Sequence, residues 1–171
     1  MKNIVRALSL MLALLCVVFA FAACNAEQSE NNDDTKGTEY YIIHKGTKIE
    51  LGKKADSVLS ALGEPKSKEA LPDCGDFGKQ TKYQYDNFML YTLTNDSGET
   101  IDQIEFLNDM AETEKGICIG DSSDDVIAAY GEPSQKSSGS LSYQNGSLYL
   151  KFSLENGNVK GISFIRSLQG N

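Results

Sequence analysis

Apolar and polar residues recur in the same order at two places along the chain. Residues 49–65 read IELGKKADSVLSALGEP, and residues 117–133 read ICIGDSSDDVIAAYGEP. Apolar residues at the first and third positions of each copy are typical of a short strand, and a stripe of apolar residues at helical spacing then leads to Gly-Glu-Pro. A self-match of this kind indicates one structural unit that occurs twice in the chain.

Each copy predicts a helix of about ten residues with one apolar side. Asp121 is the expected N-cap of the second helix, whereas Lys53 stands at the matching position of the first, so the first helix is expected to be less well capped. A glycine and a proline end each helix. The residues of the two stripes and of the two ends are Val58, Leu59, Leu62, Gly63, Pro65, Val126, Ile127, Tyr130, Gly131 and Pro133.

The match continues after each helix, where Tyr85 corresponds to Tyr143 and Tyr91 to Tyr149, and an insertion around Lys66–Gln80 is expected to form a loop. Turn-forming residues divide each copy into three strands. The sequence therefore predicts an α+β fold of two tandem repeats, each a short helix plus a three-stranded antiparallel meander, forming a sheet with helices on one face. Tyr40–His44 is expected to add a strand at the edge of that sheet.

The strand pattern also predicts a binding face. In residues 148–154 every even position is apolar, so the even positions are expected to face the helices. A sheet covered on one side is normally polar on the other, yet large apolar or aromatic residues occupy odd positions. We expect these residues, with a neighbouring lysine, to bind a partner: Met89, Tyr91, Leu93, Tyr149 and Lys151. The alternative is that the segment around Tyr40–Ile43, or the other repeat, covers this face.

The N-terminus predicts export and lipid attachment. Residues 1–23 carry two basic residues and then an apolar run, which is the order of a secretory signal peptide. The run ends in Phe-Ala-Ala-Cys, which resembles the lipobox of bacterial lipoproteins and implies that a lipid is attached to Cys24. An uncleaved transmembrane anchor is the alternative, since the run is close to the shortest length that spans a bilayer. Residues 24–38 are polar and acidic and predict a disordered tether.

The charge of the chain narrows the class of partner. Sixteen lysines and arginines against 24 acidic residues leave a net charge of −8. Removal of residues 1–23, which include Lys2 and Arg6, changes this to (16 − 2) − 24 = −10. Such an acidic chain argues against nucleic acid as a ligand and against a basic patch for lipid headgroups. Membrane attachment is therefore expected through the lipid on Cys24.

The side chains that catalysis or metal binding needs are sparse. His44 is the single histidine, and the sequence has no nucleophile-elbow, zinc-ligand, calcium-loop or phosphate-loop spacing. We therefore expect neither an enzyme nor a metal or other cofactor. With Cys16 in the signal peptide and Cys24 lipidated, Cys74 and Cys118 remain, either as a disulfide, which export permits, or as two independent thiols.

The duplicated Gly-Val-Gly-Pro pattern, followed twice by a meander, resembles the superfamily of β-lactamase inhibitory protein (BLIP) and the SmpA/OmlA lipoproteins. The matching positions are Gly52, Val58, Leu62, Gly63 and Pro65, then Gly120, Val126, Tyr130, Gly131 and Pro133. The resemblance implies BLIP-like repeats at 39–109 and 110–171. It also implies a non-enzymatic module that binds an extracytoplasmic or envelope protein through its sheet face. The expected location is the outer side of the cell membrane, or the outer membrane where the host has one. A structural or assembly role in the envelope, and a small-ligand or peptide carrier, are the alternatives.

Overall fold

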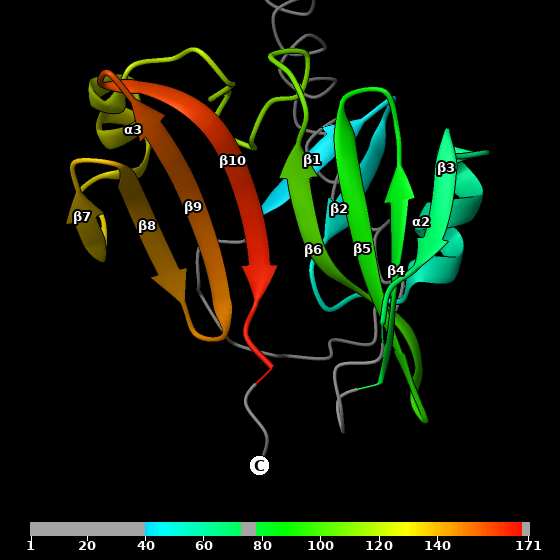
Figure 1. Ribbon diagram of the computed structural model, residues 1–171. Coiled ribbons are helices and arrows are strands. Elements are labelled where there is room, and N and C mark those ends of the chain that lie inside the picture. Colours follow the sequence, from blue (N-terminus) through cyan, green and yellow to red (C-terminus); the bar gives the residue numbers. More distant parts are fainter. Residues whose placement is uncertain (1–39, 73–77, 169–171) are drawn as a thin grey trace, which may run out of the picture. The chain divides into compact units, whose positions relative to one another are not determined.

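A large antiparallel sheet dominates the computed structural model, which describes residues 40–72 and 78–168 (Figure 1). Eight strands lie in the order β3-β4-β5-β6-β10-β9-β8-β7, and β1 and β2 form a separate two-stranded sheet. The strands are β1 Tyr41–His44, β2 Thr47–Glu50, β3 Ser67–Ala70, β4 Lys79–Gln84, β5 Phe88–Asn95, β6 Gly98–Phe106, β7 Gln135–Ser137, β8 Ser140–Asn145, β9 Leu148–Glu155 and β10 Asn158–Arg166. The helices in the described residues are α2 Ala55–Leu62 and α3 Ser123–Tyr130.

The prediction of an α+β fold built from two helix-plus-meander repeats is wrong, because the described part of the chain is mostly β. Each helix is only eight residues long and fully buries a single residue, Ala55 in α2 and Val126 in α3. Each half of the large sheet has four strands instead of three, since β3 and β7 extend its two edges. Every residue of these two edge strands is exposed. Backbone pairing holds them without apolar burial, so no hydrophobic alternation marked them in the sequence.

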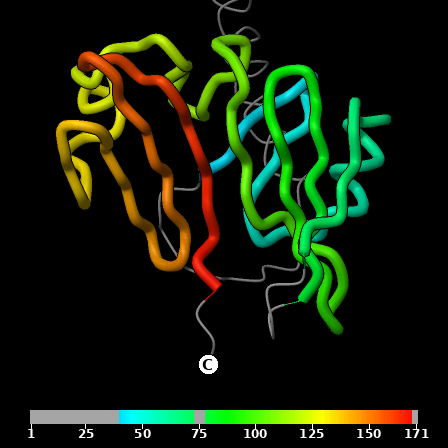
Figure 2. Tube along the Cα trace, viewed as in Figure 1, coloured from blue at the N-terminus to red at the C-terminus, as the bar shows by residue number. Residues whose placement is uncertain are grey.

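The hydrophobic core lies on one face of the sheet. Its sheet residues alternate along the strands, and both helices and the β1–β2 hairpin add side chains to the same cluster. In the tube view the hairpin lies behind β5 and β6, and the red C-terminal strand β10 lies beside the green β6 (Figure 2). The largest fully buried side chains are Phe88, Phe152, Phe164, Ile42, Ile49, Leu90, Ile101, Ile104, Leu141, Leu150, Ile162 and Val126.

The segment before the first helix does not extend the large sheet, as the sequence had suggested for Tyr40–His44. Instead β1 pairs with β2 and buries Ile42 against the core, and Ile42 also forms an isolated bridge with Thr113. The short strand expected at residues 117–119 is absent from the structure. The backbone there is held locally, with the Ile117 amide donating to Thr113 Oγ1 at 3.1 Å. A loop can therefore carry alternating apolar residues when one of them anchors it to the core.

The helix caps differ as expected, although one residue was misassigned. Ser122, not Asp121, is the N-cap of α3, and it forms a capping box with Asp125. Asp121 instead accepts a hydrogen bond from the Cys118 amide at 2.8 Å. Helix α2 begins after Lys54 without a side-chain cap, which confirms that its N-terminus is the less well capped.

The strand register aligns the two halves of the sheet differently from the sequence match. Gln84 pairs with Met89 across the first inner hairpin, while Ser142, the counterpart of Gln84 beside the edge strand, pairs with Lys151. Lys151 is therefore the structural counterpart of Met89. Tyr149 lies two residues beyond it toward the β8–β9 turn, in a hairpin whose strands are paired farther than in the first half, so it does not correspond to Tyr91. An even shift keeps Tyr149 on the same face of the sheet.

Candidate functional site

Two rows of side chains cross the face of the sheet opposite the core, which we call the open face. In the first row each residue is the register partner of the next on seven neighbouring strands: Glu69, Lys82, Tyr91, Gln103, Ile165, Tyr149 and Gln144. The second row reads Gln84, Met89, Glu105, Ser163, Lys151 and Ser142. Since directly opposite residues point to the same side, both rows form continuous lines.

The structure brings four of the five expected binding residues into these rows. Tyr91 and Tyr149 share the first row, three strand spacings or about 14 Å apart. Met89 and Lys151 share the second row; Lys151 is exposed, and the other three side chains are half-buried. Leu93 lies farther along β5, and its side chain is only 5% exposed, so it offers little surface to a partner.

A bulge explains the position of Leu93. The register of β5 against β6 shifts between Tyr91 and Thr92, and Asp102 of β6 has no direct partner there. Gln80 Nε2 donates to Asp102 Oδ2 at 3.3 Å, and Arg166 forms an ion pair with Asp102 Oδ1 at 3.3 Å. Burial raises the pKa of the Asp102 carboxyl group, although Arg166 and Gln80 oppose that rise. This end of the open face is therefore a buried polar cluster.

Hydrogen bonds and ion pairs hold the side chains of the two rows in place. Tyr91 Oη donates to Glu105 Oε2 at 3.2 Å and lies 3.5 Å from Met89 Sδ. Lys82 Nζ pairs with Glu69 Oε2 at 2.6 Å. Burial, and then the Glu105 carboxylate, raise the pKa of Tyr91, so its hydroxyl stays neutral and acts as a donor. The aromatic ring of Tyr91 is thereby fixed in orientation.

The sequence did not indicate that Gln103 and Ile165 join the two tyrosines. They do so because β6 and β10 are hydrogen-bonded neighbours at the centre of the sheet, with Ile165 opposite Gln103. These strands are far apart in sequence, and no local pattern specifies their pairing. The one indication in the sequence was that odd positions face the same side in both halves of the sheet. This did not specify which strands are neighbours.

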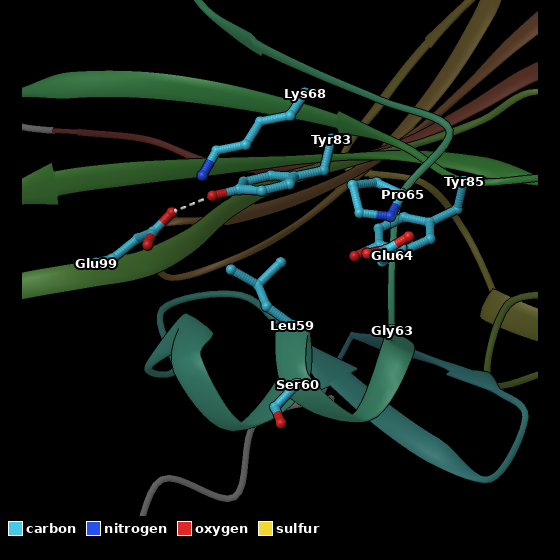
Figure 3. Close-up of a pocket in the computed structure, with 9 residues that line it drawn as sticks. All are labelled: Leu59, Ser60, Gly63, Glu64, Pro65, Lys68, Tyr83, Tyr85 and Glu99. Carbon is cyan, nitrogen blue, oxygen red and sulfur yellow. Dashed lines mark hydrogen bonds between the residues drawn. The ribbon is translucent and has the colours of Figure 1, made fainter.

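A pocket of about 440 Å³ lies on the core side of the sheet, between α2 and the strands β3, β4 and β6 (Figure 3). We call it the α2 pocket. Its lining residues are Leu59, Ser60, Gly63, Glu64, Pro65, Lys68, Tyr83, Tyr85 and Glu99. Tyr83 Oη donates to Glu99 Oε1 at 2.9 Å, and Lys68 Nζ lies 5.1 Å from the centre of the Tyr83 ring. The sequence analysis did not identify this site, because its residues come from four separate elements.

The side chains with catalytic or metal-binding chemistry are not gathered at a site in the residues described. His44 packs its ring edge against Phe88, with ring centroids 5.1 Å apart, and burial lowers its pKa. Within residues 40–72 and 78–168, no group of three or more histidine, cysteine and acidic side chains is placed to hold a metal ion. Over the same residues, no helix has the length and apolar character needed to cross a membrane.

The cysteines are only partly described. Cys118 is half-buried, and burial followed by the Asp121 carboxylate raises the pKa of its thiol, which makes it a weak nucleophile. Cys74 and Cys24 lie outside the described residues, so the disulfide and the lipid attachment stay predictions. Compared with known protein families, curated proteins and solved structures, the chain matches none of them.

Proposed function

We propose that this chain is a lipid-anchored protein of the extracytoplasmic side of the membrane, and that it binds another protein through the open face of its sheet. The observation that carries the proposal is the pair of cross-strand rows, in which Tyr91, Tyr149 and Ile165 lie half-buried among polar side chains. Aromatic anchors ringed by polar groups are the usual composition of a protein interface. The lipobox ending in Cys24 supports the anchored location.

The charge of the open face defines the kind of partner. The two rows contain two lysines and two glutamates, so they are balanced, whereas the whole chain carries a net charge of −8. A balanced face does not select a strongly basic partner through long-range attraction. The proposed partner is therefore an envelope or extracytoplasmic protein whose contact surface has an apolar centre and mixed charges. Its affinity is expected to change little between low and physiological salt.

Site-specific crosslinking tests this proposal. A photoreactive phenylalanine analogue at position 91 or 149 should capture the same partner, and the analogue at Tyr41 should not. Tyr41 is a matched control because it is also half-buried but belongs to the β1–β2 hairpin, where Lys48 Nζ lies 4.2 Å above its ring.

Binding by the purified partner then measures the anchors. Tyr91→Ala or Tyr149→Ala is expected to weaken binding by about 1–2 kcal/mol, with Tyr41→Ala near the wild-type value. The proposal fails if the two open-face variants bind as the wild type does per folded molecule, or if position 41 captures the same partner.

A further inference from the structure

The region of the α2 pocket has a counterpart in the second half of the sheet, and there the corresponding tyrosine is hydrogen-bonded to the end of the helix. The edge-strand register equates the two sites, since Lys68 pairs with Tyr83 in the first half and Lys136 pairs with Leu141 in the second. Two residues after Tyr83 and Leu141, Tyr85 directly after β4 therefore corresponds to Tyr143 of β8. Both tyrosines are about 95% buried, at 6% and 5% exposure.

The two corresponding hydroxyl groups differ in their partners. Tyr143 Oη donates to the carbonyl of Gly131, the C-cap residue of α3, at 3.0 Å. Tyr130 packs against the Tyr143 ring with centroids 5.3 Å apart, and it takes the place of the smaller Leu62 in α2. In the first half, Tyr85 Oη is fully buried, lines the pocket and has no hydrogen-bond partner. A buried hydroxyl without a partner is costly, and in a pocket it indicates a place for a ligand atom.

The polar residues of the α2 pocket are also specific to the first half. Tyr83 and Glu99 form a hydrogen bond there. In the second half, Leu141 is the counterpart of Tyr83, because it pairs with Lys136 as Tyr83 pairs with Lys68. Gly157 is the counterpart of Glu99, because each precedes the residue that forms an isolated bridge to the start of the helix, Asn158 or Thr100. Thr92 Oγ1 donates to the same Glu99 oxygen and so helps to fix it. In the second half Leu141 is fully buried in the core without a polar partner, so the fold does not need a hydrogen-bonded pair at this place. Stability alone therefore does not explain the tyrosine and the carboxylate.

The chemistry of the pocket favours a cation. Figure 3 shows the Tyr83 ring with Lys68 on one side and Glu99 at its hydroxyl, while Glu64 and Pro65 stand beside Tyr85 at the other end. The Lys68 ammonium above the Tyr83 ring shows that this ring accepts a positive charge. The lining of the pocket contains two carboxylates, Glu64 and Glu99, but one ammonium, Lys68, and the C-terminal end of α2 adds the negative end of its dipole.

We propose that the α2 pocket binds an ammonium or guanidinium group, with Tyr83 as the aromatic wall, Glu64 and Glu99 as counter-charges and Tyr85 Oη as an acceptor from an N–H of the ligand. The cation is either a lysine or arginine side chain of a protein or a free alkylamine. This pocket lies on the core side of the sheet, so the inference does not rest on the binding proposed for the open face.

Calorimetric titration of the full chain tests the inference with two pairs of probes. n-Butylammonium and n-butylguanidinium represent free amines, and the Nα-acetyl methylamides of lysine and arginine represent protein side chains. Either pair is expected to bind saturably, and at least about tenfold more tightly than neutral 1-butanol. Tighter binding of the amino-acid derivatives identifies a protein side chain as the source, and tighter binding of the simple amines identifies a free amine.

Three pocket variants and one control variant separate binding in the pocket from nonspecific attraction. Tyr83→Leu, which introduces the residue found at the corresponding position of the second half, should weaken binding by about tenfold. Glu99→Gln should weaken binding by a similar factor, and it replaces Tyr83→Leu as the test where that variant does not fold. Lys68→Met removes the competing ammonium and should strengthen binding about threefold. Tyr143→Phe is the matched control and should leave binding unchanged. Equal binding of 1-butanol, no effect of either pocket variant, or weaker binding by Lys68→Met would overturn the inference.

Discussion

The pair Tyr85 and Tyr143 allows the cost of one buried hydroxyl to be measured against its own internal control. Both side chains are buried core residues at corresponding positions of the sheet, and burial raises the pKa of each, so both hydroxyls are neutral. Replacement by phenylalanine removes one oxygen and leaves the ring in place. The two variants therefore differ only in whether the lost hydroxyl had a partner.

The free energy of unfolding is expected to fall in one variant and not in the other. Tyr143→Phe removes the 3.0 Å hydrogen bond to the Gly131 carbonyl, and a bond of this kind contributes about 0.5–1.5 kcal/mol. Gly131 is exposed, so water can satisfy its carbonyl and the loss should stay within that range. Tyr85→Phe removes a buried hydroxyl that has no partner, so its free energy of unfolding should be unchanged or higher by up to about 1 kcal/mol.

Urea unfolding of the full chain, followed by far-ultraviolet circular dichroism, measures both variants against the wild type. A difference of about 1–2 kcal/mol between the two variants is expected, with unchanged dependence on urea concentration. For a folded unit of this size, 1 kcal/mol corresponds to a shift in Tm of about 3–5 °C. Equal losses in both variants would refute the reasoning, because Tyr85 Oη would then have a partner in the free protein.

Three further predictions follow from individual contacts and from the N-terminus. Ser122→Ala removes the acceptor of the α3 capping box and should cost about 1 kcal/mol of stability, whereas Ser122→Asp keeps an acceptor and should lose much less in the same urea assay. Asp102 has a raised pKa in the folded state, so the folded state holds this proton more tightly than the unfolded state. The contribution of Asp102 to stability should therefore fall as the pH rises from about the ordinary pKa of 3.8 through the folded-state pKa. Asp102→Asn should remove that part of the pH dependence. Parallel plots of unfolding free energy against pH for wild type and variant would contradict this prediction. Cys24→Ala should abolish metabolic labelling with palmitate, and continued labelling would rule out this lipidation site.

Local sequence patterns predicted the features that depend on near neighbours. Gly-Glu-Pro ended both helices, and alternation along residues 148–154 identified Leu150 and Phe152 as core residues. The same parity placed Tyr91 and Tyr149 on the opposite face. These predictions succeeded because the positions of side chains on a helix or strand follow from its period.

Features that depend on pairing between distant segments required the tertiary structure. Two exposed polar segments became edge strands, because the backbone of β4 and of β8 offered them hydrogen bonds, and this changed the class from the expected α+β to mostly β. The pairing of β6 with β10 placed Ile165 and Gln103 between the two tyrosines of the open face. Backbone pairing is nearly independent of side-chain identity, so composition and periodicity carry little information about it.

The sequence by itself determined that Tyr85 and Tyr143 are equivalent, since both follow the same helix-and-turn pattern. Only the tertiary structure decided that the Tyr143 hydroxyl is hydrogen-bonded to the end of α3, whereas Tyr85 lines a pocket. The difference lies in the packing of a helix end against its strands: Tyr130 packs against the Tyr143 ring in one half, and the smaller Leu62 stands at the matching position of α2 in the other. Whether such a space is filled depends on the summed volumes of side chains from several elements, which no local pattern along the chain records.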